Sequence, residues 1–315
     1  MSMRGRAVAL VAMTVLGTGA MGPATAGRSV PPRIYGLVVA GAPNDLSQVD
    51  TVNVEVGAPP TQITWYQAWS FGGAFPSAQA RAIAARGATP EMVWEPWDPS
   101  AGVNQPAYRL SQISSGAFDS YLIAWARAIK AYGGPVVIRF AHEMNGTWYP
   151  WDEGVNGNAA GSYRAAWQHV VGLFQRYRVG NVTWFWAPNT PYPGSTALSE
   201  LYPGDGYVGR VGLDGYNWGT TQTWSSWQSF GDLFGPGVAQ LQAITSRPIY
   251  IGETSSADLG GDKAAWISDM WAWLAQHPEV RGLTWFDIDK EATWQLDSTA
   301  ASVAAFRTGL PGFLG

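Results

Sequence analysis

The sequence predicts an α/β protein that folds as a (β/α)8 TIM barrel, and three observations favour this fold class. Short apolar runs alternate with helical segments along the chain, as in a parallel sheet with crossover helices. Some of these runs, such as 136–138 and 249–251, are continuously apolar, which is typical of strands buried on both faces. The 315 residues suit one barrel, and no linker rich in Pro, Gly or Ser divides them.

The first 26 residues are predicted to be a signal peptide. Arg4 and Arg6 precede an apolar run over 7–20, and small residues at 24–26 fit a cleavage site. The run is shorter than the ~20 apolar residues that a membrane-spanning helix needs. We therefore expect a secreted protein with no membrane association after cleavage, in which residues 27–315 form a single domain. An uncleaved anchor is the alternative.

Eight segments are predicted as strands, because they are rich in β-branched and aromatic residues and lie between turn signals. They are Ile34–Val39, Ile63–Trp69, Thr89–Trp94, Val136–Ala141, Val182–Ala187, Val208–Gly212, Ile249–Gly252 and Gly282–Phe286. Apolar residues that recur about every 3.6 positions predict helices between the later strands. The clearest helical segments are 118–129, 167–174, 263–275 and a closing helix near 298–307.

The composition argues against several classes of function. The chain has no cysteine, which excludes thiol catalysis, and its three histidines argue against a multi-histidine metal site. The formal charge of −4, with scattered Lys and Arg, argues against a nucleic-acid partner. We therefore expect neither a cofactor nor a metal. The 18 Trp and 13 Tyr are partly core, and those near strand ends are also suited to binding the flat faces of sugars.

Two glutamates follow apolar strands, Glu143 after the fourth and Glu253 after the seventh. Active sites of such barrels lie at the C-terminal ends of the strands, so the two carboxyl groups are expected to face each other across one mouth. A pair about 5–5.5 Å apart is what retaining glycoside hydrolysis requires. The alternative is that each glutamate caps a loop or pairs with a neighbour such as Arg139.

The proposed chemistry predicts how these glutamates should be placed. A general acid must keep its proton near neutral pH, so we expect burial or the other carboxylate to raise the pKa of Glu143. Donors such as Tyr216 or Arg139 should keep Glu253 ionised. His142 is expected at the mouth, where it hydrogen-bonds a sugar hydroxyl or positions a carboxylate.

Four segments resemble glycoside hydrolase family 26, and together they extend over most of the chain after residue 26. They are Ile138–Trp151, Gly212–Trp218, Ile249–Thr254 and Trp285–Asp287. The resemblance implies that Glu143 is the acid/base and Glu253 the nucleophile. The substrate-binding residues expected beside them are His142, Trp148, Tyr216, Trp285, Arg139, Asn145 and Trp151. Further tryptophans near strand ends that could line a groove are Trp65, Trp69, Trp94, Trp97 and Trp218.

The resemblance implies an endo-β-glycanase whose partner is a polysaccharide with β-1,4 linkages. We expect a monomer, and the predicted signal peptide implies secretion. The stretch 148–151 departs from the usual pattern of mannanases, so mannan, mixed-linkage β-glucan and a bacterial exopolysaccharide all stay open as substrates. Two alternatives of other classes are a non-catalytic polysaccharide-binding barrel and a purely structural secreted barrel. Retention of both glutamates argues against the first of these.

Overall fold

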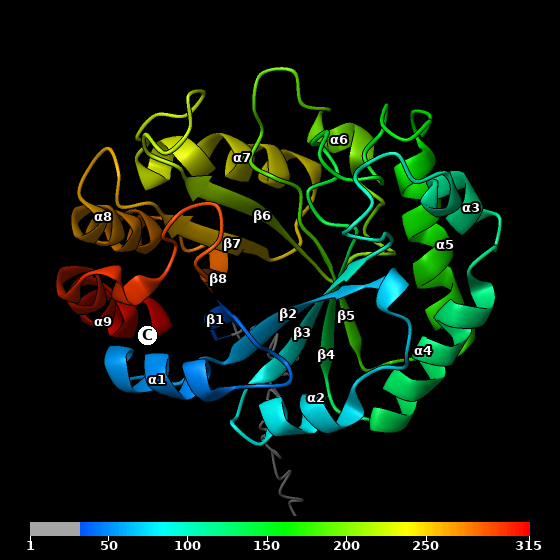
Figure 1. The fold of residues 1–315 in the computed structure, drawn as a ribbon, viewed down its shortest axis with the longest axis horizontal. Helices are drawn as coiled ribbons and strands as arrows, with labels where there is room; N and C mark the ends of the chain where they lie inside the picture. Colours follow the sequence, from blue (N-terminus) through cyan, green and yellow to red (C-terminus); the bar gives the residue numbers. More distant parts are fainter. Residues whose placement is uncertain (1–31) are drawn as a thin grey trace, which may run out of the picture. The chain divides into compact units, whose positions relative to one another are not determined.

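The computed structural model describes residues 32–315, and its centre is a closed barrel of parallel strands (Figure 1). The strands are β1 (Ile34–Val39), β2 (Gln62–Ala68), β3 (Thr89–Glu95), β4 (Val136–Phe140), β5 (Val182–Trp186), β6 (Arg210–Asn217), β7 (Ile249–Ser256) and β8 (Val280–Asp287). Each strand pairs with the next, and β8 pairs with β1, so the sheet has no free edge. The predicted (β/α)8 barrel is confirmed, whereas the predicted signal peptide lies outside the described residues.

Helices connect the strands and surround the barrel (Figure 1). They are α1 (Ser47–Val56), α2 (Ser77–Ala84), α3 (Leu110–Ser114), α4 (Asp119–Tyr132), α5 (Ser162–Arg176), α6 (Leu198–Leu201), α7 (Phe230–Ile244), α8 (Lys263–Gln276) and α9 (Ala300–Leu314). The four helices predicted from apolar periodicity are α4, α5, α8 and α9. The last of them continues beyond its predicted end, because Phe313 still packs on Trp271 of α8 with ring centroids 5.5 Å apart. No helix within residues 32–315 is long and apolar enough to cross a membrane.

Side-chain caps fix the starts of the helices that follow β6, β7 and β8. Ser229, Asp262 and Thr299 each accept a hydrogen bond from the backbone N–H three residues further on. Such a cap satisfies an N–H that has no partner inside the helix. The caps therefore fix the C-terminal ends of the loops that follow β6, β7 and β8.

Several tryptophans expected to line a groove are instead part of the core. Trp94 is fully buried, and its ring centroid lies 5.3 Å from that of Trp125 on α4. Side chains alternate along a strand, so a tryptophan next to a residue that faces the barrel axis points outward to the helices. The groove prediction is wrong for the buried residues Trp65, Trp69, Trp94 and Trp151.

The strands β6 and β7 are longer than predicted. They continue to Asn217 and Ser256, and their last residues pair with one another. A register shift precedes Asp214, which then pairs with Glu253. Glu253 therefore lies inside β7 rather than just after it, and the ladder with β6 fixes its backbone.

Replacing Trp125 by alanine is expected to destabilise the fold by about 3–5 kcal/mol, because the ring is fully buried and its loss leaves a cavity. Chemical denaturation of wild type and variant measures this change. The control is Trp224→Ala, since that ring is 69% exposed and its removal should change the unfolding free energy by less than about 0.5 kcal/mol. Equal changes in both variants would contradict the assignment of Trp125 to the core.

Candidate active site

The backbone turns sharply where β4 ends, and this turn brings Glu143 to the mouth of the barrel. Ala141 and Glu143 have φ angles of 46° and 52°, a region that residues other than glycine seldom adopt. The N–H of Ala141 donates to the carbonyl oxygen of Trp94, and that of Glu143 to the carbonyl oxygen of Ala187. The ends of β3 and β5 thus fix the turn from both sides. Strained backbone of this kind costs about 1–3 kcal/mol per residue and is concentrated at functional sites.

The carboxyl group of Glu143 is buried, and two side chains donate hydrogen bonds to it. Trp148 Nε1 donates to Oε2 at 2.8 Å, and Asn189 Nδ2 donates to Oε1 at 3.0 Å. Burial, and then the negative charge of Glu253, raise the pKa of Glu143 to about 7. The two hydrogen bonds oppose this rise because they favour the ionised form. A carboxyl group with this pKa can donate a proton at neutral pH and accept one afterwards.

Asn145 was predicted to bind substrate, but its buried side chain contacts another part of the protein. Its Nδ2 donates to the carbonyl oxygen of Asn189, and its Oδ1 accepts the N–H of the same residue, both at 2.9 Å. Asn145 therefore positions Asn189, which in turn contacts Glu143. Asn189 itself was missed, although it lies just beyond β5, and a polar residue after an apolar strand is a functional candidate.

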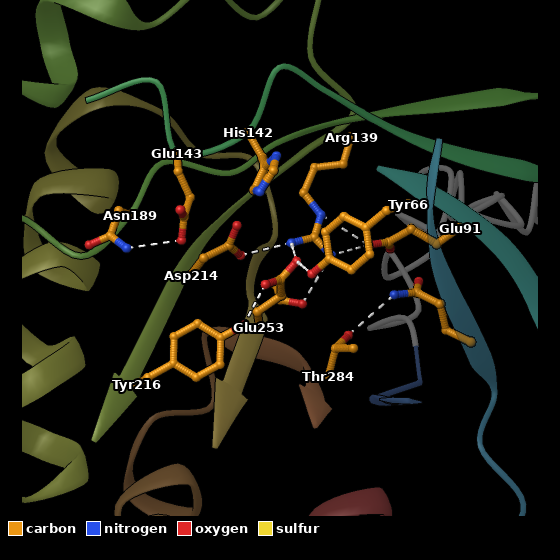
Figure 2. A network of polar contacts seen from close by, with 12 residues as sticks. Tyr66, Glu91, Arg139, His142, Glu143, Asn189, Asp214, Tyr216, Glu253 and Thr284 are labelled. Carbon is orange, nitrogen blue, oxygen red and sulfur yellow. Dashed lines mark hydrogen bonds and ion pairs between the residues drawn. The ribbon is translucent and has the colours of Figure 1, made fainter. Parts of the chain in front are cut away.

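The carboxylate of Glu253 accepts hydrogen bonds from three side chains (Figure 2). Tyr66 and Arg139 Nη1 donate to Oε1 at 2.6 and 2.8 Å, and Tyr216 donates to Oε2 at 2.5 Å. Burial and the charge of Glu253 raise the pKa of both tyrosines, so both keep their protons and remain donors. Tyr216 was predicted beside the site, whereas Tyr66 was missed because an aromatic residue within a strand is usually part of the core.

The guanidinium group of Arg139 is fully buried and contacts three carboxyl groups. Its Nη1 donates to Glu253 at 2.8 Å and to Asp214 at 2.9 Å, and its Nη2 donates to Glu91 at 2.7 Å. Gly252 makes room for this network, because a Cβ atom there would lie 2.4 Å from Asp214 Oδ1. The prediction that Arg139 binds substrate is wrong, because the side chain is fully buried below Glu253 and positions it instead.

The carboxyl group of Asp214 holds its proton more strongly than an ordinary aspartate does. Burial raises the pKa of its carboxyl group well above the usual range, and the adjacent Arg139 opposes the rise. Potential ligand atoms of His142, Asp214 and Glu253 lie within 4.8 Å of one another, but the guanidinium group already contacts both carboxyl groups and repels a cation. The expected absence of a metal stays a prediction.

His142 lies next to Glu143 and is enclosed by aromatic rings. Its Nε2 is 3.2 Å from the hydroxyl of Tyr149, and its ring centroid is 6.0 Å from that of Tyr66. Burial, together with the positive charge of Arg139, lowers the pKa of His142 well below its usual value, so the ring is neutral. Its Nδ1 is buried and has no hydrogen-bond partner among residues 32–315. A direct contact between His142 and a sugar stays a proposal.

Trp148 and Trp151 have different roles although both follow β4. The ring of Trp148 is 39% exposed, stacks on Tyr192 at 5.9 Å between centroids and donates from Nε1 to Glu143, so a partly exposed ring lies beside this glutamate. Trp151 is fully buried, and its Nε1 donates to the carbonyl oxygen of His142 at 2.7 Å. The prediction that Trp151 binds substrate is therefore wrong, and the residue instead fixes the backbone next to Glu143.

Trp285 was expected to form part of the sugar-binding floor, but it faces away from the mouth. Its ring is fully buried and lies 5.4 Å from Phe306 of α9 between centroids. The next residue in β8, Phe286, points to the other side and contacts Tyr216 at 5.5 Å. Trp294, from the loop after β8, lies 5.0 Å from Tyr216. These two residues, rather than Trp285, border the site on this side.

The side chains of Glu143 and Glu253 approach the same space from β4 and β7 (Figure 2). They are the same residue type in different surroundings. Glu143 is partly protonated near neutral pH, whereas Glu253 contacts a guanidinium group and two hydroxyl donors. Two carboxyl groups that differ in this way can supply a proton and a nucleophile in one reaction.

Comparisons with known sequences agree with this geometry. A model of glycosyl hydrolase family 26 matches residues 33–255, which include both glutamates. Endoglucanase H of Acetivibrio thermocellus is 36% identical over 247 residues, which are 77% of this chain and 26% of that protein. Mannan endo-1,4-beta-mannosidase A and B of Caldalkalibacillus mannanilyticus is 36% identical over 90 residues, 27% of this chain and 17% of that protein. The chain thus spans about a quarter of Endoglucanase H.

Solved structures share the barrel. The catalytic domain of an endo-beta-1,4-mannanase from Bacillus sp. JAMB-750 has a TM-score of 0.64 at 18% identity, over 89% of this chain and 86% of that one. A beta-mannanase from Bacteroides ovatus has a TM-score of 0.60 at 15% identity, over 88% of each chain. At these identities the likeness shows a common fold. Because the family model matches well over half of the sequence, the chain belongs to glycosyl hydrolase family 26, as its motifs predict.

Proposed function

We propose that this protein hydrolyses internal β-linkages of a polysaccharide with retention of anomeric configuration. The observation that carries the proposal is the contrast between its two glutamates. The pKa of Glu143 is raised to about 7, while Glu253 accepts hydrogen bonds from Arg139, Tyr66 and Tyr216. Retaining hydrolysis needs one carboxylic acid and one carboxylate on either side of the scissile bond.

In the first step the carboxylate of Glu253 attacks the anomeric carbon and forms an ester bond to it. The bond from that carbon to the glycosidic oxygen breaks, and this oxygen takes the proton of Glu143. Trp148 Nε1 and Asn189 Nδ2 stabilise the Glu143 carboxylate that results. In the second step Glu143 accepts a proton from water, and the hydroxide attacks the anomeric carbon. The ester bond breaks and Glu253 is again a carboxylate.

The substrate class rests on the relatives. One is named an endoglucanase and another a mannan endo-1,4-beta-mannosidase, and both names denote cleavage inside a polysaccharide chain. The endoglucanase aligns with a much larger share of this chain, so we favour a β-glucan over mannan. A polysaccharide is too large to enter a cell, which agrees with the signal peptide predicted over residues 1–26. Secretion and a monomeric state remain predictions.

A reducing-sugar assay of residues 27–315 against barley β-glucan, mannan, glucomannan, xylan and capsular polysaccharides tests the proposal. Activity is expected on one of the β-linked polymers and should be lost in Glu253→Ala, because that variant lacks the nucleophile. Binding without release of reducing ends would favour the non-catalytic polysaccharide-binding barrel. Equal activity in wild type and Glu253→Ala would contradict the assigned chemistry.

The pH dependence of kcat/KM is expected to fall as the pH rises above about 7, because Glu143 must be protonated to act as the acid and its pKa is about 7. Replacing Asn189 by alanine removes a donor that favours the ionised form of Glu143, so the pKa of Glu143 should rise. The alkaline limb of the profile should then move to higher pH. A shift to lower pH, or none in a variant that folds normally, would contradict the role of Asn189.

A further inference from the structure

A continuous series of aromatic rings leads from the nucleophile to the protein surface. Tyr216 donates to Glu253, and its ring lies 5.0 Å from that of Trp294. Trp294 lies 4.9 Å from Trp218, and Trp218 lies 5.3 Å from Trp224, all between ring centroids. Trp294 is buried, Tyr216 and Trp218 are half-buried, and Trp224, the last ring of the series, is 69% exposed.

A second exposed apolar residue lies in the loop that contacts the one carrying Trp224. Leu259, in the loop after β7, is 61% exposed, and its carbonyl oxygen accepts the N–H of Thr220 at 3.1 Å. Gly219 permits this approach, because its φ is 54° and a Cβ atom there would lie 1.8 Å from the same oxygen. The loop over 217–228 and the loop after β7 therefore lie side by side (Figure 1).

Hydrogen bonds within the loop over 217–228 define the position of Trp224. Ser225 Oγ donates to the carbonyl oxygen of Gly219 at 2.9 Å, and Thr221 Oγ1 donates to that of Trp218 at 2.7 Å. Asn217 Oδ1 accepts the N–H of Gln228 at 3.0 Å and so closes the loop at its base. An exposed tryptophan on a loop with this many internal bonds is a fixed surface that needs little ordering when a ligand binds.

The chemistry of this loop fits a neutral, hydroxyl-rich ligand. Residues 217–228 include no charged residue and are rich in hydroxyl and amide side chains around their tryptophans. An uncharged surface lacks the attraction that nucleic acids and anionic membranes require. Flat aromatic rings combined with neutral hydrogen-bonding groups are suited to sugar rings, which have apolar faces and hydroxyl edges.

We propose that Trp224 is a distal subsite that stacks on sugar units of the same polysaccharide chain whose scissile bond lies at Glu143 and Glu253. This inference rests on the proposed function. It adds that the bound segment of the polysaccharide extends from the scissile bond to Trp224. Tyr216 and Trp218 are half-buried and their ring centroids lie 6.4 Å apart, so partly exposed rings connect the catalytic site with Trp224. The subsite lies beyond Trp218 and Trp294, so only a ligand of several sugar units reaches both Trp224 and the two glutamates.

The test compares wild type, Trp224→Ala, Trp224→Phe and Phe71→Ala on a long polymer and on a short oligosaccharide of the same linkage. Loss of one stacked ring should lower kcat/KM on the polymer about three- to tenfold in Trp224→Ala. The value for the short substrate should stay unchanged. Trp224→Phe should recover most of the loss because it retains an aromatic face. Phe71 is 68% exposed in the segment after β2 and is the control for removing an exposed ring.

Gel electrophoresis through the same polymer measures binding without turnover. Weaker retardation of Trp224→Ala than of Phe71→Ala supports the subsite even where no product forms, so it separates this inference from the proposed activity. Equal behaviour of Trp224→Ala and wild type on the polymer would overturn the subsite while leaving the proposed function intact. An equal loss in Phe71→Ala, or on the short substrate, would also overturn it. A wild-type protein that neither cleaves nor binds any polymer would contradict both the subsite and the proposed function.

Discussion

The buried guanidinium group of Arg139 is the feature on which the geometry of the site depends. It contacts Glu91, Asp214 and Glu253 at 2.7–2.9 Å, and all four side chains are buried. Removing the guanidinium group would leave buried carboxylates without a cation, which costs roughly 3–5 kcal/mol. The missing side chain at Gly252 leaves room for the network, and after a register shift Asp214 pairs with Glu253. The barrel thereby fixes the orientation of the carboxylate at position 253.

The surroundings of the second glutamate, Glu143, differ from those of Glu253: burial raises the pKa of Glu143, and within residues 32–315 no guanidinium group or other cation is among its hydrogen-bond partners. A strained turn places Glu143 in a buried position, where neutral donors only partly offset the cost of its ionisation. Its pKa consequently responds to the charge of Glu253. When Glu253 becomes an ester, its negative charge disappears and the pKa of Glu143 falls. This suits Glu143, which must release its proton in the same step. The two sites are thus coupled through electrostatics.

The sequence predicts the barrel and brings Glu143 and Glu253 to one mouth, because apolar strands and the residues that end them follow simple rules. It does not predict which side of a strand each residue faces. A difference of one position in β8 separates the buried Trp285 from Phe286, which contacts Tyr216. The sequence also does not separate residues that contact substrate from residues that position catalytic side chains. Arg139 and Asn145 are predicted to bind substrate, but both position other residues of the site. That distinction depends on burial and on partners distant in the sequence.

The most direct test of the central claim is to trap the intermediate on Glu253. An activated glycoside of the preferred sugar, with fluorine in place of the 2-hydroxyl group, slows release of the covalent species, and peptide mass spectrometry then locates the label. One sugar attached to Glu253, and none in Glu253→Ala, is the expected result for a carboxylate held by Arg139, Tyr66 and Tyr216. A label on Glu143, or rapid hydrolysis of the polysaccharide with no label at any carboxylate, would contradict it.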